Sequence, residues 1–173
     1  LLKEFLNLGQ EIANIRESKD LIPKIISSAC RLTGAERGAI FLLNGEKLEI
    51  KASNNLLSEE IFHSDFEPSM KIIENVAKTG NGCIKNIDRK ETPPSLSVKE
   101  MVLTVICVPL ILRGMIKGVL YHDNRLLGTT FRDSDLELLD YFAAQAAIAL
   151  DNVAAYEEIQ ELNRKLTEEK NYL

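Results

Sequence analysis

Two strand–turn–strand patterns, one in each half of the chain, most constrain its fold. In the second half, Val102–Leu112 is the most apolar run of the sequence, and Arg113-Gly114 separates it from another strand pattern, Met115–Asn124. In the first half, Asn44-Gly45 follows the apolar run 39–43 and precedes a second strand pattern. Tight turns of this kind join antiparallel neighbours. The sequence therefore predicts an antiparallel sheet.

Individual residues place these strands within the sheet. The run 39–43 is continuously apolar, which is typical of an inner strand covered on both faces. From Lys47 to Ala52, charged and apolar residues alternate, which favours a strand near a sheet edge with one solvated face. Pro109 has no backbone N–H, so we expect strand pairing to loosen there or to end on one side. Gly118 predicts a bulge or a close approach of another backbone.

Helical patterns precede the first hairpin. Within 1–17, apolar residues recur at steps of three and four and line one face of a helix. A second helix is expected to follow Ser18 or Asp20, either of which can cap it. Pro23 is expected in its first turn, and Gly34 at its end in a left-handed conformation.

The middle of the chain is less regular. Alternation over 61–66 allows a short strand, 69–78 predicts a helix, and 83–87 predicts another strand. Residues 88–94 are polar and contain prolines, which indicates a loop, and 95–101 predict one or two helical turns. With helices around an antiparallel sheet, the chain is expected to have an α+β fold.

The last helical pattern begins at Asp133, which is expected to cap it, and continues to the end of the chain for about 40 residues. Most globular helices are far shorter. Its first half carries an apolar stripe whose alanine-rich centre, FAAQAAIAL, permits close approach of another helix. The stripe consists of Leu136, Leu139, Phe142, Ala143, Ala146, Ala147 and Leu150.

Beyond Asn152 this stripe narrows to single apolar residues at steps of four, three, four and seven. A seam this narrow is typical of a two-stranded coiled coil. One domain offers little that could cover it, so we expect a parallel homodimer, the alternative being a helical tail in solvent. The seam consists of Ala155, Ile159, Leu162, Leu166 and Leu173.

Composition and charge argue against several functional classes. The net charge of -5, without a cluster of Lys and Arg, argues against a nucleic-acid-binding surface. No apolar run is long enough to cross a bilayer and no signal peptide opens the sequence, so we expect a cytoplasmic protein without membrane contact. The three cysteines, Cys30, Cys83 and Cys107, are widely spaced and indicate reduced thiols.

The sequence carries no pattern typical of an enzyme. It has no phosphate loop, no dinucleotide-binding glycine pattern, no serine-hydrolase elbow and no metal-binding histidine motif. His63 lies far from His122-Asp123, which is interpreted as a surface pair at a strand end. Cys83 and Cys107 could meet on the sheet, although the favoured interpretation is that both are small buried hydrophobic residues. We expect no catalytic residue and no metal site.

Three segments resemble the GAF domain, a family of small-molecule-sensing modules in signalling proteins. They are LTGAERGAIFLL (32–43), VICVPLILRGMIKGVLYHDNR (105–125) and FRDSDLELLDYFAAQAAIALDNVAAYEE (131–158). In the family these are the entry into the sheet, the central hairpin and the closing helix. The resemblance implies a central antiparallel sheet of about six strands with the terminal helices on one face. On the other face it implies a pocket roofed by residues 54–101.

The resemblance also implies where a ligand would bind, but not which ligand. The sequence lacks the N-K-x-F-x-D-E pattern of cyclic-nucleotide-binding members and the Cys-His pair of bilin-binding members. It also lacks the cysteine pairing of the free methionine sulfoxide reductase members, so the cofactor stays unknown. The residues expected to contact a ligand under the roof are Phe66, Ile72, Ile87, Ser95, Ser97, Lys99 and Thr104.

We expect three parts: an N-terminal signalling helix (1–19), a GAF domain (20–151) and a C-terminal coiled-coil signalling helix (152–173). Similar domains sit in bacterial sensor kinases and enhancer-dependent transcription activators, so the expected function is sensing and dimerisation. A linked output domain beyond this chain would receive the signal. The alternatives are a ligand-free dimerisation spacer or a cysteine-based redox sensor. Dimer contacts are expected at Phe5, Leu8, Ile12, Ile159, Leu162 and Leu166.

Overall fold

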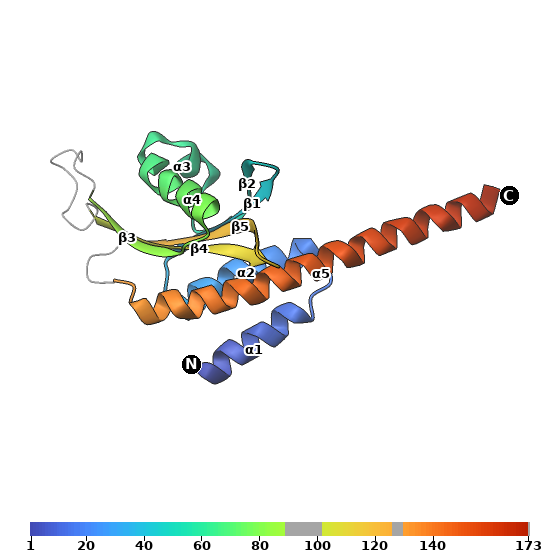
Figure 1. The fold of residues 1–173 in the computed structure, drawn as a ribbon, viewed down its shortest axis with the longest axis horizontal. Helices are drawn as coiled ribbons and strands as arrows, with labels where there is room; N and C mark the ends of the chain where they lie inside the picture. The colour runs from blue at the N-terminus through green and yellow to red at the C-terminus, as the bar shows by residue number, and fades with distance from the viewer. Residues whose placement is uncertain (89–101, 126–129, 173) are drawn as a thin grey trace.

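The computed structural model describes residues 1–88, 102–125 and 130–172 (Figure 1). An antiparallel sheet forms its centre, with helices on both faces, so the expected α+β architecture is confirmed. In chain order the elements are α1 (Leu2–Ala13), α2 (Ser18–Thr33), β1 (Arg37–Asn44), β2 (Lys47–Asn54), α3 (Ser58–Phe62), the 3-10 helix η1 (Ser64–Phe66), α4 (Glu67–Thr79), β3 (Cys83–Asp88), β4 (Val102–Leu112), β5 (Met115–Asn124) and α5 (Asp133–Tyr172).

The five described strands lie in the order β2-β1-β5-β4-β3, and every neighbouring pair is antiparallel. The pairs β1–β2 and β4–β5 are the two predicted hairpins, and β1 pairs with β5 to join them. β2 lies at one edge of the sheet and β1 lies inside it, as their sequence patterns indicated.

About six strands were expected, and one expected strand is helical instead. Residues 61–66 form the end of α3 and the whole of η1. The backbone N–H of Leu57 donates to the Glu60 carboxylate at 2.7 Å, which caps the start of α3. The alternation over 61–66 does not reveal this cap.

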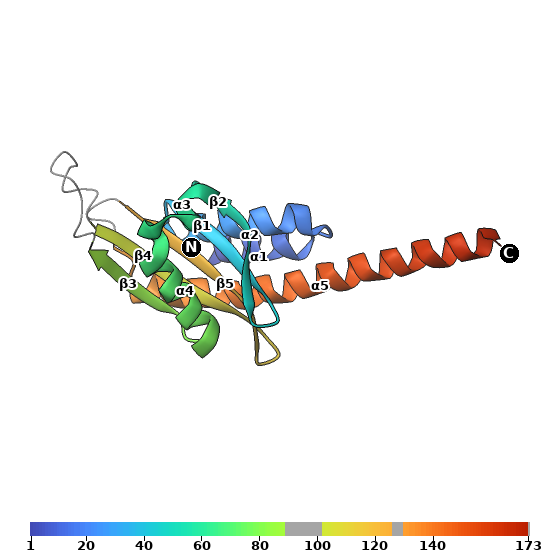
Figure 2. The same ribbon diagram turned by 90° about the horizontal axis from the view of Figure 1, so that it is seen from above.

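Helices cover both faces of the sheet (Figures 1 and 2), and each face carries its own apolar core. On one face, which we call the helix face, α1, α2 and α5 pack with Ile40, Ile106 and Leu120. On the other, which we call the roof face, α4 packs with Val105 and Tyr121. Successive strand residues point to opposite faces. Residue parity along each strand therefore decides which side chains can meet a ligand under the roof.

The two hairpin turns use glycine where the backbone requires it. Between β4 and β5, Arg113 and Gly114 both have positive φ, at 51° and 77°, as a tight two-residue hairpin turn demands. Between β1 and β2 the loop residues are Gly45 and Glu46, and of these only Gly45 has positive φ. Asn44, expected within the turn, is the last residue of β1.

Pro109 and Gly118 behave as their sequence positions predicted. Pro109 pairs with Val119 of β5 but lies beyond the pairing with β3, which ends at Cys107. Strand pairing therefore ends on one side of β4 before the proline. At Gly118, an added Cβ would clash with the carbonyl oxygen of Phe41, so the close approach of β1 requires glycine.

The start of α2 differs from the prediction. The helix begins at Ser18, and the preceding Glu17 makes no side-chain capping bond. The N–H and the hydroxyl of Ser18 both donate to Glu157 Oε1 at 2.9 Å, which ties α2 to α5. Pro23 consequently lies inside the helix rather than in its first turn. Gly34 ends α2 with φ 73°, as predicted.

α5 is one helix of 40 residues. Between Leu139 and Val153 one of its sides is buried on the sheet and α2, and the following turns project beyond the sheet (Figure 1). Asp133, expected as the cap, is the first helical residue, and Asp135 accepts the N–H of Arg132 at 2.7 Å. No helix in the described ranges combines the length and the apolar character that a membrane span needs.

α1 packs against α2 and α5 of the same chain. Leu8 and Ile12, expected at a dimer interface, are only 2% and 1% exposed in the helix-face core. Phe5 is partly buried against the same core. The apolar periodicity of 1–17 therefore detects a face that is covered within one chain, while Leu2 and Leu6 point outward.

Candidate ligand-binding site

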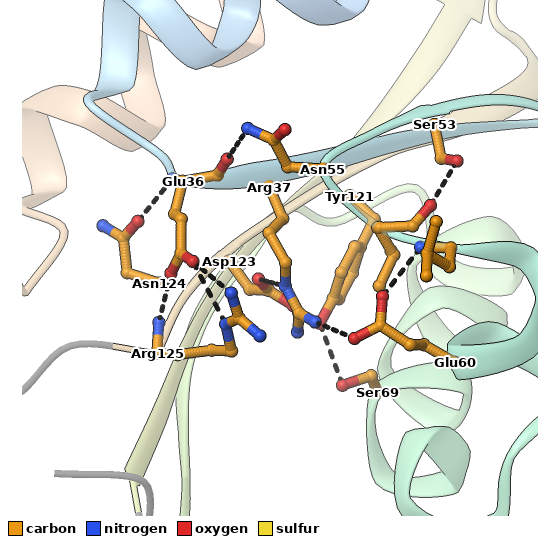
Figure 3. Close-up of polar contacts among 12 residues, drawn as sticks. Glu36, Arg37, Ser53, Asn55, Glu60, Ser69, Tyr121, Asp123, Asn124 and Arg125 are labelled. Atoms are coloured by element: carbon orange, nitrogen blue, oxygen red, sulfur yellow. Dashed lines mark hydrogen bonds and ion pairs between the residues drawn. The ribbon is translucent and has the colours of Figure 1, made fainter.

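A buried ion pair joins β1 to β5 at one end of the roof face (Figure 3). Arg37 and Asp123 are partners across the two strands. Arg37 Nε donates to Asp123 Oδ1 at 2.6 Å, and Arg37 Nη2 donates to Asp123 Oδ2 at 2.7 Å. The two side chains are 3% and 0% exposed. A bidentate pair of this geometry fixes the planes of both groups and holds each charge where water does not reach.

Tyr121 extends this pair toward α4. Its hydroxyl lies 2.5 Å from Asp123 Oδ2 and 3.0 Å from Ser69 Oγ. An ionised carboxylate only accepts, so the Tyr121 hydroxyl donates to Asp123 and accepts a hydrogen bond from the Ser69 hydroxyl. Burial and the negative charge of Asp123 raise the pKa of Tyr121 well above its usual value. The phenol therefore stays protonated and acts as a donor to Asp123.

Glu60 links the same guanidinium to α3. Arg37 Nη1 donates to Glu60 Oε1 at 3.3 Å, and Glu60 also caps α3 through the N–H of Leu57. Burial alone would lower the pKa of Arg37, but the hydrogen bond and charge of Asp123 outweigh it and raise that pKa. Arg37 is thus a fixed cation shared between the sheet and the roof.

A cleft of about 340 Å³ opens beside this network. Its volume falls within the range of small-molecule sites. Its walls combine two guanidinium groups, three carboxyl groups, one imidazole and one aromatic ring. The lining residues are Arg37, Glu59, Glu60, His63, Asp65, Phe66 and Arg125.

Arg125 lines the cleft and pairs with Glu36, which lies outside the lining (Figure 3). The Arg125 Nε donates to Glu36 Oε1 at 3.1 Å, and the backbone N–H of Arg125 donates to Glu36 Oε2 at 3.2 Å. The hydrogen bond from Arg125 is the main cause of the lowered pKa of Glu36. Both side chains are partly exposed, so a ligand can reach them.

Three of the residues predicted to bind a ligand lie on the roof side. Phe66 lines the cleft and meets the Tyr121 ring edge to face, with ring centroids 5.3 Å apart. Ile72 and Ile87 pack against the roof-face core instead of lining the cleft. Three further predicted residues, Ser95, Ser97 and Lys99, lie outside the described residues.

Thr104 differs from its prediction. It lies on β4 between Leu103 and Val105, which both belong to the roof-face core. Strand alternation therefore turns Thr104, like Ile106, toward the helix face. The expected ligand contact at Thr104 therefore lies on the face of β4 away from the roof.

His122-Asp123 is not the surface pair that its position suggested, because both residues are fully buried. Asp123 faces the roof, whereas His122 faces α2, where its ring lies beside Ile26. Burial lowers the pKa of His122 to about 4, so the ring is neutral near pH 7. Among the residues that the structure places, no three His, Cys, Asp or Glu side chains gather as a metal-binding group.

Sequence reasoning missed Arg37, Glu60 and Arg125. The signal that could have found Arg37 is its place at the start of a strand whose next residues are all apolar. A charge in such a strand needs a partner at the same depth, and Asp123 at the end of β5 supplies it.

Cys83 and Cys107 do meet, as partners across β3 and β4. Both are free thiols. Burial raises the pKa of each, most strongly for the fully buried Cys107. Burial raises the pKa of the third thiol, Cys30, to about 11. All three environments disfavour the thiolate that redox chemistry uses.

Comparison with known proteins shows the family to which this sequence is similar. The sequence model of the GAF domain matches residues 18–150. Among curated proteins, a probable 3',5'-cyclic phosphodiesterase of Caenorhabditis elegans, pde-5, is 26% identical over 160 residues. The match covers 84% of this chain and 22% of that protein, so the chain spans about a fifth of the length of this relative.

Solved structures share the fold at low identity. The GAF domain of an Acinetobacter phosphoenolpyruvate-protein phosphotransferase is 19% identical with a TM-score of 0.66, covering 89% of this chain and 94% of that one. The corresponding domain from Coxiella burnetii is 16% identical with a TM-score of 0.68, covering 91% and 96%.

Proposed function

Because this chain belongs to the GAF domain family of regulatory ligand-binding modules, we propose that it senses a small molecule in the cleft beside Arg37 and reports it through α5. In this proposal residues 20–151 form the sensing domain of a bacterial signalling protein. Residues 1–19 and 152–173 are signalling helices, and two copies associate through the projecting part of α5. A linked output domain, such as a kinase or a transcription activator, receives the signal.

The observation that carries the proposal is the alternation of side chains at the end of β5. Tyr121 and Asp123 bind the roof elements α3 and α4 through Arg37 and Ser69, whereas His122 between them packs toward α2. A ligand that shifts α3 against the sheet would therefore move a strand that also supports the terminal helices. α2 is bound to α5 through Ser18 and Glu157.

The lining of the cleft favours a small polar ligand with one flat or apolar part. Arg125 and Glu59 offer charge at its rim, and Phe66 offers a ring face or edge. Outside the cleft, the fully buried Val105, Cys107 and Val119 fill the roof-face core.

Native mass spectrometry of the freshly purified chain tests this proposal, because it reports retained small molecules and the number of subunits together. A ligand recovered in this way, or found in a thermal-shift screen of metabolites, should bind at least about tenfold more weakly to Arg125→Ala. Arg113→Ala is the matched control, since Arg113 lies at the opposite end of β5, in the exposed turn before it. Equal binding by both variants, or no ligand at all, would contradict the sensing proposal.

The filled roof-face core supports a second candidate, a dimerisation spacer without a ligand. In that case the charged cleft residues only stabilise α3 on the sheet. Dimeric protein that retains no small molecule and binds none in the thermal-shift screen would favour the spacer.

A further inference from the structure

An exposed apolar strip runs along α5 farther than the sequence seam indicated. Ile148 is 52% exposed although its neighbours Ala147 and Ala149 are buried on the sheet side. Farther along the helix, Ile159, Leu162 and Leu166 are 56%, 52% and 56% exposed. The seam therefore begins within the part of α5 that covers the domain, and continues into the part that projects from it (Figure 1).

One heptad register contains the whole strip. Ile148, Ala155 and Leu162 are seven residues apart and occupy the d positions, whereas Ile159 and Leu166 occupy a positions. The remaining a position within the strip is Asn152, which is also exposed. With 3.6 residues per turn, these residues lie on the side of α5 opposite Phe142, Ala146 and Val153, which are buried in the helix-face core.

Both ends of the strip are defined. Toward the sheet, the preceding a position is Gln145, whose amide lies so close to Gly9 of α1 that a Cβ there would clash with it. Toward the C-terminus, the next d position is Glu169, a charged residue. The uninterrupted part of the strip therefore extends from Ile148 to Leu166, and Tyr141, one heptad before Ile148, is also 69% exposed.

We propose that a second copy of this chain covers the strip as a parallel, in-register coiled coil in which the two Asn152 side chains meet. The inference rests on the dimer of the proposed function and adds its orientation, its register and the residue that fixes them. In a parallel pair, each a residue faces the same residue of the other helix. The amide of one Asn152 then donates to the carbonyl of the other.

In an antiparallel or shifted pair, the Asn152 amide would lose this hydrogen-bond partner. Asn152 would then face an apolar strip residue, and its donors and acceptors would be buried without partners. A single asparagine at an a position is known to select two parallel strands in this way, at a cost in stability. Parallel pairing also brings the two C-terminal ends of α5 together, where a linked output domain would begin.

Cysteine cross-linking tests orientation and register directly. Asn152→Cys, incubated with oxidised glutathione, should form a disulfide between two copies, with one glutathione disulfide reduced to two thiols for each bond formed. Gln160→Cys is the matched control, because Gln160 is equally exposed on α5 but occupies a b position away from the strip. The unchanged chain controls for Cys30, Cys83 and Cys107.

The role of the amide needs a second variant. Asn152→Ile should lower the dissociation constant of the dimer by roughly tenfold or more. It should also add species larger than a dimer in light scattering, whereas Gln160→Ile should do neither.

Three results would overturn the inference. A dimer that does not cross-link at position 152 excludes the parallel register but leaves the proposed dimer intact. A monomeric unchanged chain removes both the dimer and its register. Cross-linking at 152 with no effect of Asn152→Ile on mass or dissociation excludes the specifying role of the asparagine.

Discussion

Gly38 and His122 are partners across β1 and β5, and the imidazole occupies the space that a side chain at Gly38 would need. A Cβ built on Gly38 would lie 2.6 Å from both Cδ2 and Nε2 of His122, and 3.0 Å from a methyl group of Ile26. At this contact the sheet and α2 are closely packed. This packing explains the glycine at the second position of β1, between Arg37 and the apolar run that starts at Ala39.

Gly38→Ala should therefore destabilise the chain by about 1–3 kcal/mol through overpacking. Chemical unfolding measures this loss. Adding His122→Ala removes the obstructing ring, so the double variant should be more stable than the sum of the single effects predicts. Strict additivity would show that the two residues do not compete for the same space.

Acidification should weaken the fold through His122. Its pKa is about 4 in the folded chain against 6.5 for a free side chain. Between these values the unfolded state binds a proton that the folded state does not, so the free energy of unfolding decreases as the pH falls from 6.5 toward 4. The shift corresponds to about 3 kcal/mol across that window.

Urea unfolding across the same pH window checks this, with His122→Gln as the variant that cannot titrate. The difference between the two proteins should shrink steadily with falling pH. A His122→Gln profile parallel to that of the unchanged chain would contradict the prediction.

Removing one partner of the Arg37–Asp123 ion pair should lower the stability of the fold more than removing both partners. Asp123→Asn leaves the Arg37 charge buried without its bidentate partner and should destabilise the chain by about 3–5 kcal/mol. Combining Asp123→Asn with Arg37→Met should recover part of this loss. Glu36→Gln, which breaks the more exposed pair with Arg125, should cost about 1 kcal/mol or less. Similar losses from both carboxylates would refute the distinction.

The projecting part of α5 should mediate association. Leu162→Glu places a charge in the centre of the exposed strip and should weaken the dimer at least about tenfold, measured by sedimentation. Gln160→Glu adds the same charge on another side of the helix and should have little effect. If both variants sediment like the unchanged chain, the strip is not the interface.

The cysteines should react slowly and unequally with a maleimide near neutral pH. Cys107 is fully buried and its thiol pKa is raised most, so it should be modified last, after the half-buried Cys83. Mass spectrometry of peptides during the reaction gives the order. Rapid modification of Cys107 in the folded chain would support the alternative function of a cysteine-based redox sensor.

The sheet could be predicted because its turns and apolar runs are local signals. The roles of Arg113-Gly114 and Pro109 can be inferred from a few neighbouring residues, and the structure agrees. The side chains at the end of β5 could not be placed in this way. Whether His122 and Asp123 are covered depends on α2 and Arg37, which lie far away in the sequence.

The candidate site was predicted least well for the same reason. Phe66 lines the cleft, whereas Thr104 lies one residue out of phase with the roof face. A shift of one residue along a strand reverses the face to which a side chain points. Resemblance to a family locates a strand more reliably than it fixes that phase. Leu8 and Ile12 show the same limit for helices, because periodicity finds an apolar face without saying what covers it.

The continuity of α5 has a mechanical consequence. Its buried half and its projecting half form one 40-residue helix with no proline or glycine between them. The helix is therefore a lever arm whose fulcrum is the helix face of the sheet. At 1.5 Å per residue the projecting turns are nearly 30 Å long, so a tilt of about 10° at the fulcrum would displace the tip by about 5 Å.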